Sequence, residues 1–336
     1  NVTLKDIAIT LGDGGTGIDY NGGNSKATAN ISTKDLEVGT ADTTGIAATM
    51  SAVDGSTLDI TTGSISTGDS NATGIRITGN NLSSGATTAE VKTTLGATVG
   101  KGVAVNGAKH NDITVSLNDS SAKDNSKIEV SGTGVDIDGG EAEGTTTVNI
   151  NQSNLQVANN GKLVNVANGT DGAVNIDVKQ NVDLLAGANL INIGTATGDI
   201  HVALNADGQK VADGSLVNVV AAGGTTTVDI NKDVAISGTG NIVKAGAIAS
   251  GSLNVNLNVE GNTGLNVASE KTALDLSAVG AANKASVKNT GTVTIAGKGT
   301  LVKGHDTNDI YLTNQGLITL NTVDTAIANN SSHIST

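Results

Sequence analysis

The most informative feature of the sequence is what it lacks: 336 residues contain no cysteine, no proline, no phenylalanine and no tryptophan. The absence of cysteine excludes a disulfide framework and a thiolate metal site. Only two aromatic residues are present, Tyr20 and Tyr311, although a compact globule of this size normally fills its core with aromatic rings. The core must therefore be built from Val, Ile, Leu and Ala, which suits thin aliphatic layers between stacked strands.

Acidic residues outnumber basic ones. The chain has 32 Asp and Glu against 19 Lys and Arg, a net charge of −13, which keeps the molecule soluble and repels phosphate backbones. We therefore expect no nucleic acid partner. No run approaches the roughly 18 apolar residues that span a bilayer, so we expect no membrane insertion by this segment. The start at Asn1, which is neither an initiator Met nor a signal peptide, leads us to expect a mature form or an excised piece.

A short signature recurs along the chain: Gly or a small apolar residue followed by Ile, Val or Leu. From Gly17 to Leu301 its steps average about 28 residues. The last two steps are irregular, which suggests that the boundary near Gly264 is misplaced. The copies begin at Gly17, Gly45, Gly74, Gly102, Gly134, Leu163, Leu190, Leu216, Ile242, Gly264 and Leu301.

Each repeat contains two further runs in which apolar residues alternate with Asn, Asp or Thr, such as 147–151 and 154–157. This period of two predicts strands with one face inward, and helical periodicity is absent. Gly- and Asn-rich clusters such as 138–140 and 159–161 predict tight turns between the strands. Three strands and three turns close one coil, and stacked coils bury one another's inward faces.

The fold class that we expect is all-β, a right-handed parallel β-helix (solenoid) of about eleven three-stranded coils. Residues 17–320 should form the coils, residues 1–16 an N-terminal edge coil, and residues 321–336 a C-terminal edge coil or tail. Inward Val, Ile and Leu should form ladders of like residues, and Asn residues at the turns can stack in hydrogen-bonded ladders along the rod.

Two repeats carry a family resemblance: Asn289-Thr-Gly-Thr-Val-Thr-Ile295 and Asn314-Gln-Gly-Leu-Ile-Thr-Leu320. They resemble the strands of bacterial type V secreted proteins, the passenger domains of autotransporter adhesins, and among them the large outer-membrane adhesins of fusobacteria. The resemblance implies a right-handed β-helix that a C-terminal β-barrel exports to the cell surface. No barrel sequence is present, and two-partner secreted filamentous haemagglutinins are similar enough to remain an alternative.

Several segments could carry chemistry, but each has a simpler interpretation. Residues 14–19 match half of a calcium-binding nonapeptide, yet such sites need tandem copies, so a Gly-rich turn is preferred. Asp69-Ser70 resembles the nucleophile segment of serine-protease passengers, yet the sequence continues Asn71-Ala72, so a turn serine is preferred. We predict no catalytic, cofactor-binding or metal-binding residues, and no cofactor.

The other polar groups also favour structural roles. The four His, at 110, 201, 305 and 333, have no metal-ligand spacing, and His201 should face solvent. Asp136, Asp138, Glu141 and Glu143 surround Gly139-Gly140, which predicts a solvated turn. A polysaccharide-cleaving site is disfavoured because Arg76 is the only Arg and the two Tyr lie far apart in the sequence. Flat ice-binding ranks of Thr are disfavoured because the Thr runs at 145–147 and 225–227 are three coils apart.

These observations lead us to expect a surface adhesin or self-association module and not an enzyme. Its expected location is extracellular, at the bacterial cell surface, either secreted or anchored at the outer membrane through the parent protein. Its expected partners are a host or bacterial surface protein or glycan, or further copies of itself. The alternative is a structural stalk that projects a functional tip outside this segment.

Overall fold

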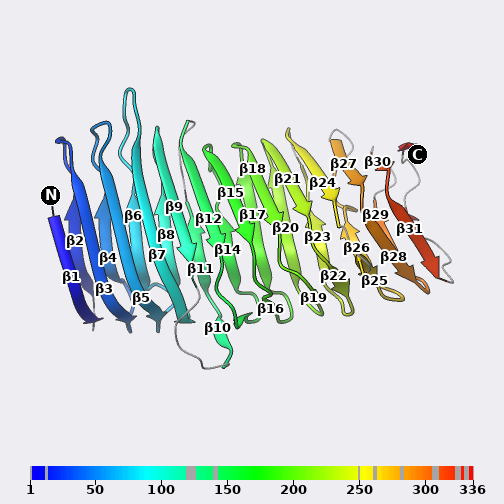
Figure 1. The fold of residues 1–336 in the computed structure, drawn as a ribbon, viewed down its shortest axis with the longest axis horizontal. Coiled ribbons are helices and arrows are strands. Elements are labelled where there is room, and N and C mark those ends of the chain that lie inside the picture. Colours follow the sequence, from blue (N-terminus) through cyan, green and yellow to red (C-terminus); the bar gives the residue numbers. More distant parts are fainter. Residues whose placement is uncertain are drawn as a thin grey trace.

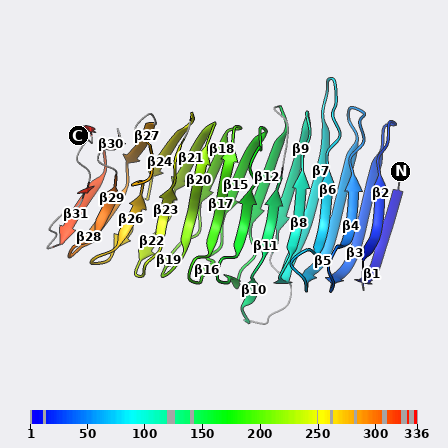
Figure 2. The same ribbon diagram turned by 180° about the vertical axis from the view of Figure 1, so that it is seen from behind.

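The computed structural model is an all-β parallel solenoid of about ten turns. It describes residues 2–11, 14–118, 126–138, 143–248, 250–259, 263–280, 284–304, 310–321, 327–328 and 333–335. Every regular element in these ranges is a β-strand, and in this part of the chain no helix is long and apolar enough to cross a membrane. Figures 1 and 2 show successive strands lying side by side from the N-terminal to the C-terminal end.

The longest sheet, sheet A, contains the first strand of every turn, and all its neighbours pair in parallel. Its main path is β1 (Val2–Leu11), β3 (Thr28–Val38), β5 (Thr57–Thr67), β7 (Thr87–Thr98), β9 (Asn111–Leu117), β12 (Thr145–Ile150), β15 (Ala173–Val178), β18 (Ile200–Leu204), β21 (Thr225–Ile230), β24 (Ser252–Leu257), β27 (Lys284–Asn289), β30 (Ile310–Asn314) and β33 (His333–Ser335).

Sheet B is the second long sheet and has twelve parallel strands. They are β2 (Gly15–Asn21), β4 (Thr43–Thr49), β6 (Thr73–Thr78), β8 (Lys101–Asn106), β11 (Thr133–Ile137), β14 (Lys162–Val166), β17 (Asn189–Ala196), β20 (Ser215–Ala222), β23 (Asn241–Ala245), β26 (Thr272–Asp275), β29 (Thr300–Lys303) and β32 (Ile327–Ala328). The expectation of about eleven coils is close to this number.

A third set of short strands lies between sheets A and B in the chain. Five of them form sheet C: β19 (Gln209–Val211), β22 (Val234–Ile236), β25 (Leu265–Val267), β28 (Thr292–Ala296) and β31 (Leu317–Asn321). Three others hold the same place in earlier turns and pair with one another: β10 (Ile128–Val130), β13 (Leu155–Val157) and β16 (Asp183–Leu184).

The prediction of three strands in every coil is wrong for the first four turns, which contain two strands each. There, one long strand spans the positions that later turns divide between a sheet A strand and a short third strand. β1, β3, β5 and β7 are 10 to 12 residues long and contain the corner that later turns place between separate strands. The end of β7 pairs with β10 through Thr98 and Val130. The register of β5 against β7 shifts between Thr61 and Ser64, so an irregularity bends the long strand.

The same change is visible in the recurring signature. In the first turns its small residue is a stacked glycine, where a Cβ on Gly102 would lie 2.6 Å from both the Gly134 carbonyl oxygen and a Leu95 methyl group. The long strand thus supplies the side chain that fills this corner. From Leu163 onward sheet B supplies it instead, through Leu163, Leu190, Leu216, Ile242, Ala273 and Leu301, all nearly fully buried. The switch from Gly to Leu therefore comes one turn after the switch from two strands to three, because Gly134 lies in the first three-stranded turn, that of β10.

One copy of the signature was misplaced, as its irregular spacing suggested. Gly264-Leu265 opens β25 in sheet C, whereas the sheet B strand of that turn is β26, in which Leu274 pairs with Val243 on one side and Val302 on the other. Leu265 and Leu274 both follow a small residue and are both fully buried. The two segments are therefore alike in pattern, and only their pairing distinguishes them.

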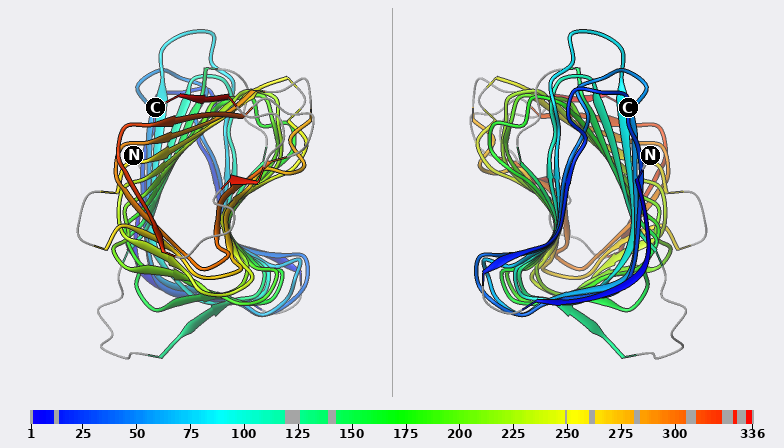
Figure 3. Two further views of the ribbon diagram at one scale, coloured as in Figure 1. Left: turned by 90° about the vertical axis from the view of Figure 1, so that its right-hand side faces the viewer. Right: turned by 90° about the vertical axis from the view of Figure 1, so that its left-hand side faces the viewer.

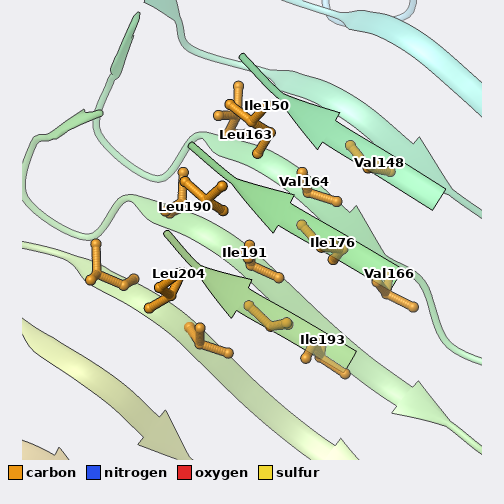
Figure 4. Close-up of a cluster of buried hydrophobic side chains, with 14 of the residues drawn as sticks. Val148, Ile150, Leu163, Val164, Val166, Ile176, Leu190, Ile191, Ile193 and Leu204 are labelled. Carbon is orange, nitrogen blue, oxygen red and sulfur yellow. The ribbon is translucent and has the colours of Figure 1, made fainter. Parts of the chain in front are cut away.

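The core is a set of aliphatic ladders, which confirms the predicted stacking of like residues. Figure 4 shows Val148 and Ile176 from sheet A facing Val164 and Ile191 from sheet B. Each such side chain contributes about 1.5–3 kcal/mol when buried, and ordering the backbone costs about 1–2 kcal/mol per residue, so a turn is stable only between neighbours. The sheet A ladder continues through Val202, Val228, Val255, Val287 and Leu312.

Two buried glutamines complete the backbone pairing where the third set of strands is interrupted. The side chain of Gln152 accepts a hydrogen bond from the Leu95 N–H at 2.7 Å and donates one to the Leu95 carbonyl at 2.8 Å. Gln209 holds Val182 in the same way, at 3.0 and 2.9 Å. Each amide thus replaces a peptide group of the missing neighbouring strand, which leaves these buried backbone groups satisfied.

Candidate functional site

The outer surface of sheet B forms a polar groove. Viewed along the axis, the outline of the coils is drawn inward on one side (Figure 3). In sheet B the outward residues of the middle strands are sheltered, since Asp136 is 5 % exposed and Asn192 is 8 % exposed. Arg76 and Lys244, at the two ends of the same register row, are exposed. We call this surface the sheet B groove and define it by the outward residues of β6 to β29. Near β20 it deepens into a cavity of about 290 Å³.

This cavity is lined by residues of three successive turns and is rich in hydrogen-bonding groups. Its lining residues include Asn218 and Lys244, which are in register with each other, and Ser215 and Asn241, which are likewise in register. Thr239, another lining residue, donates a hydrogen bond to Asp213 at 2.7 Å. The remaining lining residues are Gly187, Ala188, Asn189 and Gly214. Small side chains thus leave the space open, and amides and hydroxyls surround it.

A row of asparagines forms the floor of the groove. In-register pairing places Asp136, Asn165, Asn192 and Asn218 on successive strands. Asn165 donates to Asp136 at 2.7 Å, Asn192 donates to Asn165 at 2.8 Å, and Asn218 donates to Asn192 at 2.8 Å. Every amide in this amide ladder donates toward the N-terminal end, because a carboxylate at that end can only accept.

Cations lie at both ends of the amide ladder. Lys101 forms an ion pair of 2.5 Å with Asp136 at the N-terminal end. Lys244 occupies the register position after Asn218 at the other end. Each ladder amide uses one of its two N–H groups within the ladder, so the second N–H remains for a ligand.

A second ladder lies at the end of the sheet A strands. Asn205 donates to Asp177 at 2.7 Å, Asn231 to Asn205 at 2.9 Å, and Asn258 to Asn231 at 3.2 Å. This confirms the predicted stacking of Asn at turns. It lies on sheet A, outside the sheet B groove.

The structure separates the acidic group that the sequence places around residues 136–143. Asp136 is not on a solvated turn but sheltered in the sheet B groove, whereas Glu143 pairs with Lys109 at 2.9 Å and His110 at 3.2 Å. The hydrogen bond and charge of Lys109 hold the pKa of Glu143 below its ordinary value, and His110 adds a smaller lowering. Asp138 is exposed, and Glu141 and Gly139-Gly140 lie outside the described residues.

The serine segment takes its simpler form, whereas the expected Gly-rich turn at residues 14–19 is wrong for all but its first residue. Residues 15–19 belong to the extended strand β2, where Asp19 is in register with Ala47 of β4, so only Gly14 precedes the strand as a turn residue. Ser70 is an exposed turn residue, next to an Asp69 carboxylate that accepts the N–H of Asn71 at 2.8 Å. Across the described residues no group of three or more His, Cys, Asp or Glu could hold a metal ion.

The histidine and threonine predictions have mixed outcomes. His201 is exposed, as predicted, and its Nε2 lies 2.6 Å from an Asp229 carboxylate oxygen. Thr145 is in register with Ala173, so the ranks of Thr are interrupted as predicted. His305 and the side chain of His333 lie outside the described residues.

The sequence interpretation missed the amide ladder, although its signal is present. Three successive repeats read Leu163-Val-Asn-Val166, Leu190-Ile-Asn-Ile193 and Leu216-Val-Asn-Val219, with Asn at one fixed place. Asn at a fixed place on the outer face of stacked strands predicts the ladder. The concave shape, which makes that face a groove, has no equivalent signal.

No family model, curated protein or solved structure matches the chain. The function must therefore be argued from the groove itself.

Proposed function

We propose that the chain is the passenger of a bacterial surface adhesin, which presents an elongated binding surface to a protein or glycan of a host or bacterial cell, or to further copies of itself. The proposal is of binding and not of catalysis. The observation that carries it is the row of polar side chains on the outward face of sheet B, which repeat at the strand spacing of about 4.8 Å over several turns. A ligand that spans several turns would gain contacts with each of them.

The finer assignments belong to the same proposal. A right-handed solenoid is supported by the strong preference of parallel crossover connections for that hand. The type V secretion class, export by an autotransporter or a two-partner route, and location at the cell surface rest on the resemblance of the strand repeats at 289–295 and 314–320. Sequencing the gene on either side tests them, since a downstream barrel or a partner transporter gene decides the secretion class.

Binding of the isolated chain to cells tests the adhesin proposal. The fluorescently labelled chain should be retained on at least one bacterial or epithelial cell type, and unlabelled chain should compete. A variant with Asn165, Asn192 and Asn218 replaced by Ala serves as the groove-altered comparison, with circular dichroism to show that it remains folded. Absence of retention on every cell type would overturn the proposal.

A structural stalk is the second candidate, and one observation favours it. The strands of sheet B pair without interruption from β2 to β32, so sheet B has no hinge at which the rod could bend. A rod of this kind can hold a tip at a fixed distance from its base. Removing residues 45–300 in frame from the parent protein separates the two functions. Full adhesion by the shortened parent favours the stalk, whereas lost adhesion favours a binding surface within the removed turns.

A further inference from the structure

We propose that the sheet B groove binds an acidic polysaccharide, a chain of sugars that carries carboxylates or sulfates, laid along the amide ladder. This inference rests on the proposed adhesin function and names the ligand class of the same surface. Three observations carry it: the sign of charge in the groove, the spacing of its polar groups, and the absence of apolar subsites from its deepest part.

The charge of the sheet B groove is opposite to that of the molecule. From β6 to β23 the charged residues in the strands of sheet B are Arg76, Lys101, Lys162 and Lys244 against Asp136 alone. From β5 to β21 the strands of sheet A carry Asp59, Glu90, Asp112, Asp177 and Asp229 against Lys92 alone. These strands of sheet B therefore carry a positive charge balance, although the whole chain has a net charge of −13.

Most of these cations are available to a ligand. Lys101 is paired with Asp136 and Lys92 with Glu90, whereas Arg76, Lys162 and Lys244 have no ion-pair partner among the described residues. Repulsion from the rest of the molecule is screened beyond about 8 Å at physiological salt, so the nearby cations dominate at contact.

The spacing of the groups suits a polymer. The amides repeat at every strand, about 4.8 Å apart, which is close to the length of one sugar unit in an extended glycan. Lys162 and Lys244 lie three strands apart in sheet B, about 14 Å along the groove. Amides can therefore meet the hydroxyls of successive sugars while the cations meet acidic groups that recur at intervals of a few sugars.

A peptide fits this surface less well. Peptides gain affinity from apolar side-chain anchors or from pairing with an open sheet edge. The cavity near β20 is lined by Gly, Ala, Ser, Thr, Asn and Lys, and the backbone of β20 is already paired with β17 and β23. A ligand rich in hydroxyls and acidic groups has partners there, whereas an apolar anchor has none.

The test measures binding of the whole chain to four immobilised polymers: polygalacturonate, dextran sulfate, neutral dextran and poly-glutamate. The proposal expects binding to at least one of the first two that weakens as salt is raised. The double variant Lys162→Gln, Lys244→Gln should lower that affinity at least tenfold, and Asn192→Ala and Asn218→Ala should lower it further. The double variant Lys210→Gln, Lys288→Gln removes two charges outside the groove and should leave affinity unchanged.

Each other outcome overturns the inference. Equal binding to neutral dextran would show that acidic groups are not required, and equal binding to poly-glutamate would show that sugars are not required. Equal losses of affinity in the two double lysine variants would show that the ligand does not bind in the sheet B groove. Cell binding without polysaccharide binding leaves the adhesin proposal and rejects this inference. Polysaccharide binding without retention on any cell supports this inference and rejects the adhesin proposal.

Discussion

At the scale of single residues, the buried glutamines make the sharpest stability prediction. Gln152→Ala removes the hydrogen-bond partners of both the backbone N–H and the backbone C=O of Leu95, which is buried inside the rod. An unsatisfied buried polar group costs about 1–3 kcal/mol, so we expect a loss of about 2–4 kcal/mol. Urea unfolding followed by circular dichroism measures it. Gln156→Ala, on the outer face of β13, is the control and should cost under about 0.5 kcal/mol.

Glu143 gives a prediction about pH. Its pKa is lowered in the folded state by Lys109, so its favourable contribution is complete above the ordinary value of 4.5 and is lost as pH falls through the lower folded pKa. Lys109→Gln should raise the Glu143 pKa toward its ordinary value. Titration of the side-chain carboxyl by NMR measures this, and an unchanged pKa would show that Lys109 is not the cause.

At the scale of the structural element, the direction of the amide ladder can be tested. Asn192→Asp removes the donor to Asn165 and places a carboxylate against a carbonyl oxygen in a sheltered position. This raises the folded pKa of the new carboxyl. Relative to wild type, stability should be retained below the unfolded pKa, near 3.9, and fall by about 2–3 kcal/mol as pH rises through the folded pKa.

Denaturant unfolding of the Asn192→Asp variant at pH 3.5 and at pH 7 compares its stability with the new carboxyl protonated and ionised. Asn106→Asp, an exposed change on β8, provides the matched control and should lose little stability at either pH. Equal losses for Asn192→Asp at both pH values would contradict a directional ladder.

The glycine stack of the first turns makes a second prediction about an element. In Gly102→Ala the new methyl group would meet the Gly134 carbonyl oxygen and Leu95, both at 2.6 Å, so the stacked turns must move apart. We expect a loss of about 1–3 kcal/mol. In Gly39→Ala the nearest atom is 3.8 Å away, so this control should be nearly neutral. Melting temperatures of the two variants measure this: that of Gly102→Ala should fall, and that of Gly39→Ala should stay close to wild type.

At the scale of the whole molecule, a solenoid should tolerate removal of one complete turn. Val174 is in register with Ile200, so deletion of residues 174–199 brings Ile200 to the position of Val174. Because each turn contacts only its neighbours, the shortened rod should fold with an unchanged β-sheet spectrum. Deletion of residues 174–186 removes half a turn, shifts every later inward residue, and should abolish cooperative unfolding. Tolerance of both deletions alike would contradict the stacked arrangement.

The sequence predicts this fold well because one rule, aliphatic residues repeated at a near-constant interval, governs nearly every turn. It fails where two segments satisfy the rule equally, as Leu265 and Leu274 do, and where a long strand such as β7 contains its own corner. The amide ladder could have been predicted from the repeated place of Asn165, Asn192 and Asn218. The groove could not, because its concavity depends on how the whole cross-section closes.

All the hydrogen bonds of the amide ladder run in the same direction, which has a consequence for a ligand bound along it. Each amide presents its groups in the same orientation, so the surface has a head at Asp136 and a tail at Asn218. A sugar chain also has two unlike ends, and the two ways of threading it would not be equivalent. The molecule would therefore bind its ligand more tightly in one orientation than in the other.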